Sequence, residues 1–215
     1  MEYLHSKEEK VSDLSESNIT RLYNEGYVFT RIDKGVMHQT RSVRIDLSRF
    51  ELTSENRRIL KKVSDISMEE IAIPYAAYDW SIGKLGKDFY DTKFGEGIFS
   101  AQKIKEVLTS EKSNFNLLFK YTDIGFAICY SNKEILHYSY PFYNLKTAPK
   151  DMGLGMMTKA IEWAQEKGLK YVYLGSLQRP GDVYKLQFEG LEWFDGTKWS
   201  KDTEKVKVIL QEKHA

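Results

Sequence analysis

Short runs of β-branched and aromatic residues, separated by polar pairs, fill the middle of the chain. Three such runs cover residues 116–121, 125–131 and 134–143, with Thr-Asp and Asn-Lys pairs between them. Runs of this composition are typical of β-strands, and short polar connections are typical of hairpin turns. The pattern therefore predicts an antiparallel meander.

The hydrophobic period then changes from that of a strand to that of a helix. Apolar residues recur at helical spacing within residues 151–167, at Leu154, Met157, Ile161 and Ala164. Gly168 follows, where a left-handed residue often ends a helix. Residues 169–175 are rich in Tyr, Val and Leu and predict a buried strand. Because a helix connects it to the preceding strand, we expect these two strands to be parallel.

The pattern is less regular in the first half of the chain. Residues 27–32 and 36–47 predict a hairpin, with Gly35 available for a positive φ at its turn. We expect helices at residues 55–62, capped by Thr53 or Ser54, at 79–90, where Gly83 and Gly86 interrupt the pattern, and at 100–108, capped by Ser100. Residues 1–20 indicate a tail or a short helix, and residues 195–199 a turn into a terminal strand.

Composition supports a folded protein with one main domain. The 215 residues are 41% hydrophobic and 13% aromatic, with 4 prolines, which is typical of a folded α/β or α+β protein. We divide the chain into a polar tail (residues 1–20), a hairpin with a basic helix (21–70) and the main domain (71–215).

Charge and cysteine content exclude several classes of protein. Lys and Arg number 32 against 31 Asp and Glu, a net charge of +1, so any basic surface must be local. The single cysteine, Cys129, excludes an internal disulfide and a multi-thiolate metal site, and it suits a reducing compartment. The histidines, His5, His38, His137 and His214, lack metal-ligand spacing. No apolar run approaches the roughly 20 residues of a membrane helix, so we expect a soluble cytoplasmic protein with no metal and no membrane partner.

The turn at Lys150, Gly153, Leu154 and Gly155 is the strongest local signal for chemistry. Two glycines at a helix start let backbone N–H groups approach an anion closely, and the helix N-terminus favours negative charge. A phosphate or a developing oxyanion suits this position. Tight packing of the helix against its neighbours explains the same glycines equally well.

The order of a meander, this turn, a helix and a parallel strand resembles the core of the GNAT acyltransferases. That family has the pattern Arg/Gln-x-x-Gly-x-Gly/Ala, and Lys150 replaces its first residue here. The resemblance implies a mixed, mainly antiparallel sheet flanked by helices, preceded by a small hairpin and helix. It also implies that the turn binds the pyrophosphate of an acyl-CoA.

Two collinear segments narrow the resemblance. EWAQEKGLKYVYLG (residues 162–175), followed by VYK (183–185), resembles the C-terminal half of arginyl-tRNA–protein transferases and their bacterial leucyl-transferring relatives. Upstream, RIDLSRF (44–50) and TSENRR (53–58) are similar to the segment that precedes the catalytic domain of those enzymes. The chain departs from the family at residues 33–40, which hold none of the cysteines of the family's N-terminal cluster.

This resemblance implies aminoacyl transfer from aminoacyl-tRNA to the α-amine of a protein or peptide, with no cofactor beyond the tRNA co-substrate. Tyr184 would protonate the leaving ribose oxygen and Lys185 would hold a phosphate. N–H groups at residues 153–155, or the strand edge at Gly175, would stabilise the oxyanion. Ser176 and Gln178, after the last core strand, join the turn as residues that bind the acyl donor. Gln178 and Arg179 suit an adenosine or a carboxylate, whereas Pro180-Gly181 is better explained as a plain turn.

A tRNA partner requires basic surface, which residues 41–62 offer with seven cations against three anions. The candidate tRNA-binding residues are Arg41, Arg44, Arg57, Arg58 and Lys61. The alternative is an ordinary solvated helix face. Tyr78, Asp79 and Trp80, with Tyr75 nearby, suit an incoming amino group, although such aromatic clusters are more often core. Cys129 and His137 are expected to be structural, with a base role as the alternative for His137.

Two other functions compete with aminoacyl transfer. One is N-acetylation by acetyl-CoA, in which the same turn binds pyrophosphate and no tRNA takes part. The other is a non-catalytic module that binds RNA or peptide, which the missing cysteine cluster leaves open. The sequence predicts neither the amino acid transferred nor the acceptor.

Overall fold

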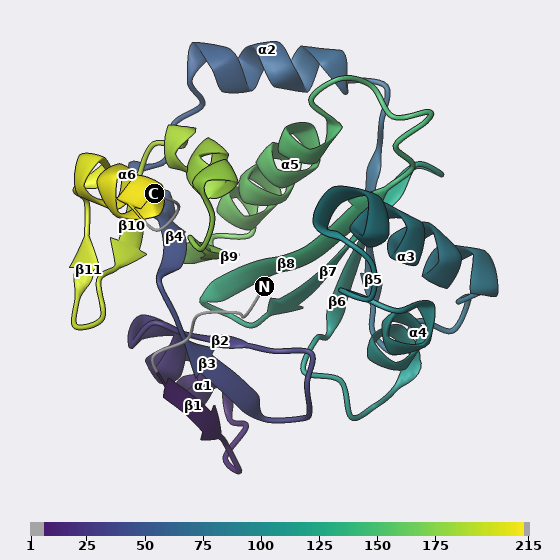
Figure 1. Cartoon of the computed structure of the whole chain (residues 1–215), viewed down its shortest axis with the longest axis horizontal. Helices are drawn as coiled ribbons and strands as arrows, with labels where there is room; N and C mark the ends of the chain where they lie inside the picture. Colours follow the sequence, from purple (N-terminus) through teal and green to yellow (C-terminus); the bar gives the residue numbers. More distant parts are fainter. Residues whose placement is uncertain (1–6, 213–215) are drawn as a thin grey trace. The chain divides into compact units, whose positions relative to one another are not determined.

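A computed structural model describes residues 7–212 and divides the chain into two compact units. Unit 1 comprises Met1–Thr53, Asn132–His137 and Ala164–Ala215, and unit 2 comprises Ser54–Ser131 and Tyr138–Trp163. Each unit therefore combines segments that are distant in the sequence. Figure 1 shows the elements of both.

Unit 1 contains a small sheet and one part of an eight-stranded sheet. The small sheet has the order β1-β3-β2 and is antiparallel throughout. In the large sheet the strands of this unit follow the order β11-β10-β4-β9-β8, and β8 and β9 are parallel, with Leu136 opposite Val172. The strands are β1 (Lys7–Lys10), β2 (Tyr27–Phe29), β3 (Val36–Gln39), β4 (Ser42–Asp46), β9 (Tyr171–Ser176), β10 (Leu191–Phe194), β11 (Trp199–Ser200) and the start of β8 (Ile135–Tyr143). The helices are α1 (Glu16–Asn24), α6 (Thr203–Glu212) and the 3₁₀ segments η1 (Leu47–Arg49) and η2 (Pro180–Gln187).

Unit 2 contains the rest of β8 and the meander. Its strands follow the order β8-β7-β6-β5, in which β5 with β6 and β6 with β7 are antiparallel. They are β5 (Met68–Ala72), β6 (Leu117–Tyr121) and β7 (Gly125–Ser131). The helices are α2 (Ser54–Lys62), α3 (Trp80–Phe94), α4 (Ala101–Thr109) and α5 (Met152–Glu166). The predicted mixed, mainly antiparallel sheet accompanied by helices is confirmed.

Local chemistry explains where several helices begin and end. The Ser100 hydroxyl accepts a hydrogen bond from the Lys103 amide at 3.1 Å and caps α4, as predicted. Asp79 caps α3 in the same way, through the Ser81 amide at 2.7 Å, and the helix continues through both of its glycines. Gly168 has a φ of +72° just after α5, which confirms the predicted helix end.

The predicted strand at residues 36–47 is wrong in one respect, because it is two strands in two different sheets. β3 ends at Gln39 and β4 begins at Ser42. The carbonyl oxygen of Gly26 accepts hydrogen bonds from the Thr40 amide at 3.3 Å and from the Ser42 hydroxyl at 2.6 Å. These bonds fix the break, so β3 stays with β2 while β4 joins the large sheet.

Some elements were not expected from the pattern. Residues 7–10 form β1 and α1 reaches residue 24, where a tail or short helix was predicted for residues 1–20. The strand β5 was not predicted, and neither was α6, which buries Val206 and Leu210. His5 and His214 lie outside the described residues.

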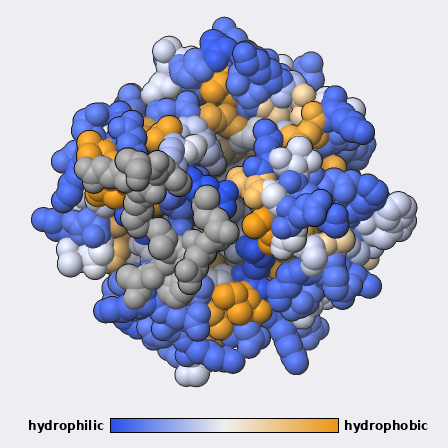
Figure 2. Space-filling view, in the orientation of Figure 1, coloured by the Kyte–Doolittle hydropathy of each residue, from blue (hydrophilic) through white to orange (hydrophobic). Residues whose placement is uncertain are grey.

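The face shown in Figure 2 is mostly hydrophilic, with hydrophobic residues in small separate groups. Among residues 7–212, no helix has both the length and the apolar character required to span a bilayer.

Candidate functional site

The turn that leads into α5 carries a carboxylate as well as glycines. Asp151 has a φ of +68°, and its carbonyl oxygen accepts the Gly155 amide at 2.9 Å. Its carboxylate accepts a hydrogen bond from Lys62 Nζ at 2.5 Å, and Arg58 Nη2 lies 3.9 Å away. The bond from Lys62 holds the pKa of Asp151 below its ordinary value. The turn therefore combines cations from α2 with an anion of its own.

The two glycines of this turn serve different purposes. A Cβ on Gly155 would lie 2.7 Å from Val63 Cγ2, so close packing requires a glycine there. Gly153 lies beside the Tyr143 hydroxyl, which a Cβ on Gly153 would meet at 3.4 Å, and burial raises the pKa of Tyr143. The packing interpretation thus accounts for Gly155, whereas Gly153 is less tightly enclosed and faces a tyrosine hydroxyl. Leu154 lies between them and is half-buried, and Lys150 is exposed.

A second group of predicted residues follows β9 in unit 1. Gln178 Nε2 donates to the Ser176 hydroxyl at 3.2 Å, and the Asp182 carboxylate accepts the amides of Gln178 and Arg179 at 2.8 and 2.9 Å. These bonds close the loop into a rigid turn. Tyr184 then lies 42% exposed in η2.

Lys185 is placed differently from its exposed neighbour. Its side chain is buried, with 8% of the residue exposed, and Nζ donates to the Ser176 carbonyl oxygen at 3.0 Å. Burial lowers the pKa of Lys185. His137 is also buried, and a 2.9 Å hydrogen bond joins its Nδ1 to the Tyr23 hydroxyl. Burial lowers the pKa of His137 to about 3.

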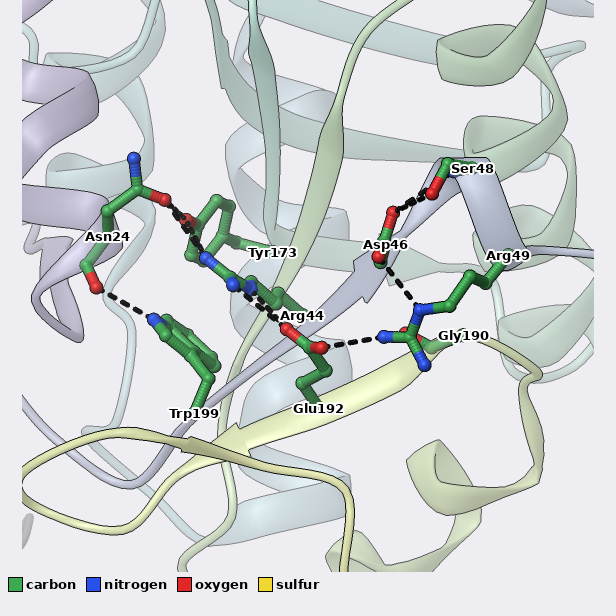
Figure 3. A network of polar contacts seen from close by, with 9 residues as sticks. All are labelled: Asn24, Arg44, Asp46, Ser48, Arg49, Tyr173, Gly190, Glu192 and Trp199. Carbon is green, nitrogen blue, oxygen red and sulfur yellow. Dashed lines mark hydrogen bonds and ion pairs between the residues drawn. The ribbon is translucent and has the colours of Figure 1, made fainter.

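Arg44 is not part of a basic surface, which corrects the expectation for that residue. Its guanidinium lies between the rings of Tyr171 and Trp199, with centroids 3.9 and 4.0 Å away, and only 7% of the residue is exposed. Glu192 Oε2 pairs with Arg44 Nη2 at 2.8 Å (Figure 3). Asn24 Oδ1 accepts a further bond from Nη1 at 2.9 Å. Arg44 of β4 therefore contacts side chains of β9, β10 and β11 and stabilises the packing of these strands.

Glu192 has a second cation, which extends this network. Arg49 Nη2 lies 2.6 Å from Glu192 Oε1, and Arg49 Nε lies 2.8 Å from Asp46 Oδ2 (Figure 3). The buried carboxylate of Glu192 thus accepts bonds from two arginines that lie close together in the sequence. Sequence reasoning missed Glu192, because nothing in its own segment indicates a partner 148 residues away.

The other candidate tRNA-binding residues are divided between the units. Arg41 in unit 1 donates to the Leu177 carbonyl oxygen at 3.2 Å, and burial lowers its pKa. Arg57, Arg58 and Lys61 lie on exposed positions of α2 in unit 2, where Arg58 pairs with Glu55. Lys61 has no ion pair with any residue in the described part of the chain. The exposed candidates are therefore those of α2.

The predicted acceptor residues lie at the start of α3. Trp80 is 74% exposed, so it is not core, and the Ser81 side chain, followed by the Ser81 amide, lowers the pKa of Asp79. Tyr78 is half-buried against Gly83, and burial raises its pKa. An exposed indole beside a carboxylate can contact a peptide and its ammonium group.

Two residues at the α5 turn, Lys62 and Tyr143, were not among the predicted site residues. Lys62 was visible as part of the basic helix, but its ion pair with Asp151 spans 89 residues. Tyr143 is the last residue of β8, ten residues before Gly153. Cys129 is buried, as expected, and burial raises its pKa. Within residues 7–212, no cluster of three His, Cys, Asp or Glu side chains is placed to hold a metal ion.

Several curated proteins similar in sequence to this chain share one name. No protein-family model matches the sequence. An aspartate/glutamate leucyltransferase of Ruegeria sp. (strain TM1040) is 28% identical over 177 residues, which are 76% of this chain and 63% of that protein. Another of that name, from Stenotrophomonas maltophilia (strain K279a), is 33% identical over 78 residues, covering 35% of this chain and 31% of the relative. Among solved structures, L-PGS from Bacillus licheniformis is 12% identical in sequence and has a TM-score of 0.47. The match covers 91% of this chain and 69% of the L-PGS chain.

Some curated relatives match about three quarters of this chain. The match spans only about three fifths of the length of those relatives. It is similar in sequence to proteins named as leucyltransferases.

Proposed function

We propose that this chain transfers an amino acid from aminoacyl-tRNA to the α-amine at the N-terminus of a protein or peptide. The observation that carries the proposal is the 28% identity over 177 residues with a protein named aspartate/glutamate leucyltransferase. That name favours leucine over arginine as the transferred residue, and Asp or Glu as the N-terminal residue of the acceptor. The resemblance of residues 162–175 and 183–185 to tRNA-dependent transferases supports a tRNA donor.

The chemistry required of the protein is modest. An α-amine has a pKa near ~7.7–8.0, so part of it is already a nucleophile at neutral pH. The protein must hold the amine against the ester carbonyl, stabilise the oxyanion and supply a proton to the leaving ribose oxygen. Tyr184, which is 42% exposed, suits the last role, because its hydroxyl is a neutral donor within reach of solvent and substrate.

The α5 turn supports a tRNA donor more than a CoA donor. Pyrophosphate at a helix N-terminus needs outward N–H groups and surrounding positive charge. Here the Tyr143 hydroxyl lies beside Gly153, 3.4 Å from where its Cβ would be, and the Asp151 carboxylate adds a negative charge at the turn. Both features weaken a pyrophosphate site. An aminoacyl ester carries no phosphate at its reacting end and does not require one there.

The basic face of α2 is proposed to contact tRNA phosphates through Arg57 and Lys61. A binding measurement across salt concentrations tests this contact directly. Neutralising both residues as Arg57→Gln and Lys61→Gln should lower the slope of log K against log salt by about 1.4 to 1.8, since each phosphate contact contributes roughly 0.7 to 0.9. The matched control neutralises Lys201 and Lys205, which are exposed cations of unit 1. An equal change in both double variants would contradict a specific role for α2.

The transfer assay decides the function. The protein is incubated with a tRNA pool charged with labelled amino acids and with peptides that differ only in their first residue, Asp, Glu, Lys or Ala. We expect labelled leucine on the Asp and Glu peptides. Labelled arginine instead would identify an arginyl-type donor, and label arriving only from acetyl-CoA would establish an acetyltransferase. Binding of tRNA without transfer from either donor would leave a non-catalytic module.

A further inference from the structure

Lys185 in unit 1 is a lysine whose amine is buried. Its Nζ lies at the carboxyl end of β9, where the strand gives way to the loop that begins at Leu177. In the described part of the chain, this buried amine makes one hydrogen bond, to the Ser176 carbonyl oxygen. A protonated lysine amine can donate three hydrogen bonds. A buried lysine that donates one therefore leaves two N–H groups without a partner, which normally lowers the stability of the fold.

There is room for a small group beside the amine. A Cβ placed on Gly175, which has a φ of +76°, would meet Lys185 Nζ at 3.9 Å and no other described atom within 4 Å beyond its chain neighbours. The absence of a side chain at Gly175 therefore leaves room beside Nζ. Crevices at the carboxyl ends of strands are where α/β proteins commonly bind their ligands.

The groups around Lys185 make the neutral amine easier to form. Burial lowers its pKa, and the positive charge of Arg179 acts in the same direction, while Asp182 acts against them. The Asp182 carboxylate is engaged by two backbone amides of its own turn. His137, on the strand next to β9, stays neutral, and the Tyr184 ring centroid lies 5.9 Å from Nζ.

We propose that Lys185 is a catalytic residue, the general base that takes the proton from the acceptor's α-amine as this amine attacks the aminoacyl ester. This inference rests on the proposed function. It replaces the phosphate-holding role that the sequence suggested for Lys185, since a buried amine with one hydrogen bond and room beside it is placed for proton transfer and not for a surface phosphate.

The proton balance of the reaction is complete with residues of this chain. The C–N bond forms as the amine proton moves to Lys185 Nζ. The ester C–O bond then breaks, and Tyr184 gives its hydroxyl proton to the leaving ribose oxygen. The proton on Lys185 returns to Tyr184, directly or through water. One amide and one ribose hydroxyl are formed, and the enzyme ends in its starting protonation state.

Two variants separate a base from a fixed charge. Lys185→Arg keeps the charge but cannot act as a base near neutral pH, and Lys185→Met keeps the approximate length without a charge or a basic nitrogen. Since general base catalysis contributes about 10²- to 10⁴-fold, we expect both variants to lose at least about 100-fold in kcat. The KM for aminoacyl-tRNA should stay within about threefold. Lys205→Met, at an exposed position of α6, is the matched control and should retain full turnover.

The readouts also distinguish failure of the inference from failure of the proposed function. Wild-type protein that transfers no amino acid would refute both. Wild-type transfer with Lys185→Arg retaining more than about a third of kcat would show that charge is sufficient, and would refute the base role alone. Thermal unfolding of Lys185→Met verifies that it folds. Nitrogen NMR follows the titration of the Lys185 amine, whose signal is identified by its loss in Lys185→Arg. The midpoint of this titration should coincide with the midpoint of the acidic limb of the wild-type pH–rate profile. Two different midpoints would contradict the base role of Lys185.

Discussion

Replacing His137 with glutamine should remove much of the acid sensitivity of unit 1. The imidazole is 1% exposed, its Nδ1 lies 2.9 Å from the Tyr23 hydroxyl, and its ring packs against that tyrosine. Burial, followed by the charge of Lys185, lowers the pKa of His137 to about 3. Folding therefore requires a neutral imidazole throughout the range in which most proteins are studied.

The size of the effect follows from the difference between the folded and unfolded pKa values. An unfolded histidine titrates near ~6.5, so below that pH the unfolded chain binds a proton that the folded chain excludes. The full contribution to stability is present above about pH 6.5 and is lost progressively as the pH falls toward about 3. Only the interval below the unfolded pKa of ~6.5 matters, which is about 1.5 pH units between pH 8 and pH 5. At about 1.36 kcal/mol for each pH unit, the free energy of unfolding falls by ~2 kcal/mol.

Urea unfolding at pH 8, 7, 6 and 5 measures this loss, followed by tryptophan fluorescence, to which Trp193 and Trp199 of unit 1 contribute together with Trp80 and Trp163 of unit 2. The free energy of unfolding should fall by ~2 kcal/mol more in the wild type than in His137→Gln between pH 8 and pH 5. A constant offset between the two proteins, caused by the altered bond to Tyr23, does not affect this difference. Curves that stay parallel within about 0.5 kcal/mol would refute the reasoning.

Three further changes test other parts of the structure. Glu192→Gln should destabilise unit 1 by about 3–5 kcal/mol in urea unfolding, because it leaves the buried charge of Arg44 without its counter-ion, and an effect below about 1 kcal/mol would contradict this. Gly155→Ala should lower the melting temperature although alanine favours helices, since its Cβ would meet Val63 at 2.7 Å, and a raised melting temperature would show that the packing argument is wrong. Tyr184→Phe should reduce kcat about 10²- to 10⁴-fold without weakening tRNA binding. A transfer rate equal to that of the wild type in single-turnover experiments would show that Tyr184 is not the acid.

The parts of the fold that were predicted correctly are those with strong local signals. The meander and α5 have clear periods, and Ser100 and Gly168 mark helix ends through bonds or angles formed within a few residues. The break between β3 and β4 had no such signal. It depends on the carbonyl oxygen of Gly26, which is distant in the sequence and binds both Thr40 and Ser42.

The candidate site was predictable in residue type but not in environment. Arg44 alternates with Val43 and Ile45, so it was expected to face solvent, but β4 lies between β10 and β9 and the aromatic rings of Tyr171 and Trp199 cover its polar face. Burial of Lys185 was equally invisible, because it directly follows two exposed residues in η2 and the turn after β9 brings its amine back to the Ser176 carbonyl oxygen. For Arg44 the decisive contacts span more than a hundred residues, and a local pattern does not contain them.

Transfer from purified leucyl-tRNA to a peptide with a free N-terminal aspartate tests the central proposal most directly. The product is identified by mass spectrometry, beside the same peptide with an acetylated N-terminus and beside a donor treated with ribonuclease. We expect one added leucine on the free peptide, and none on the acetylated peptide or from the digested donor. An unmodified free peptide, under conditions in which the protein is folded and binds tRNA, would contradict the proposal.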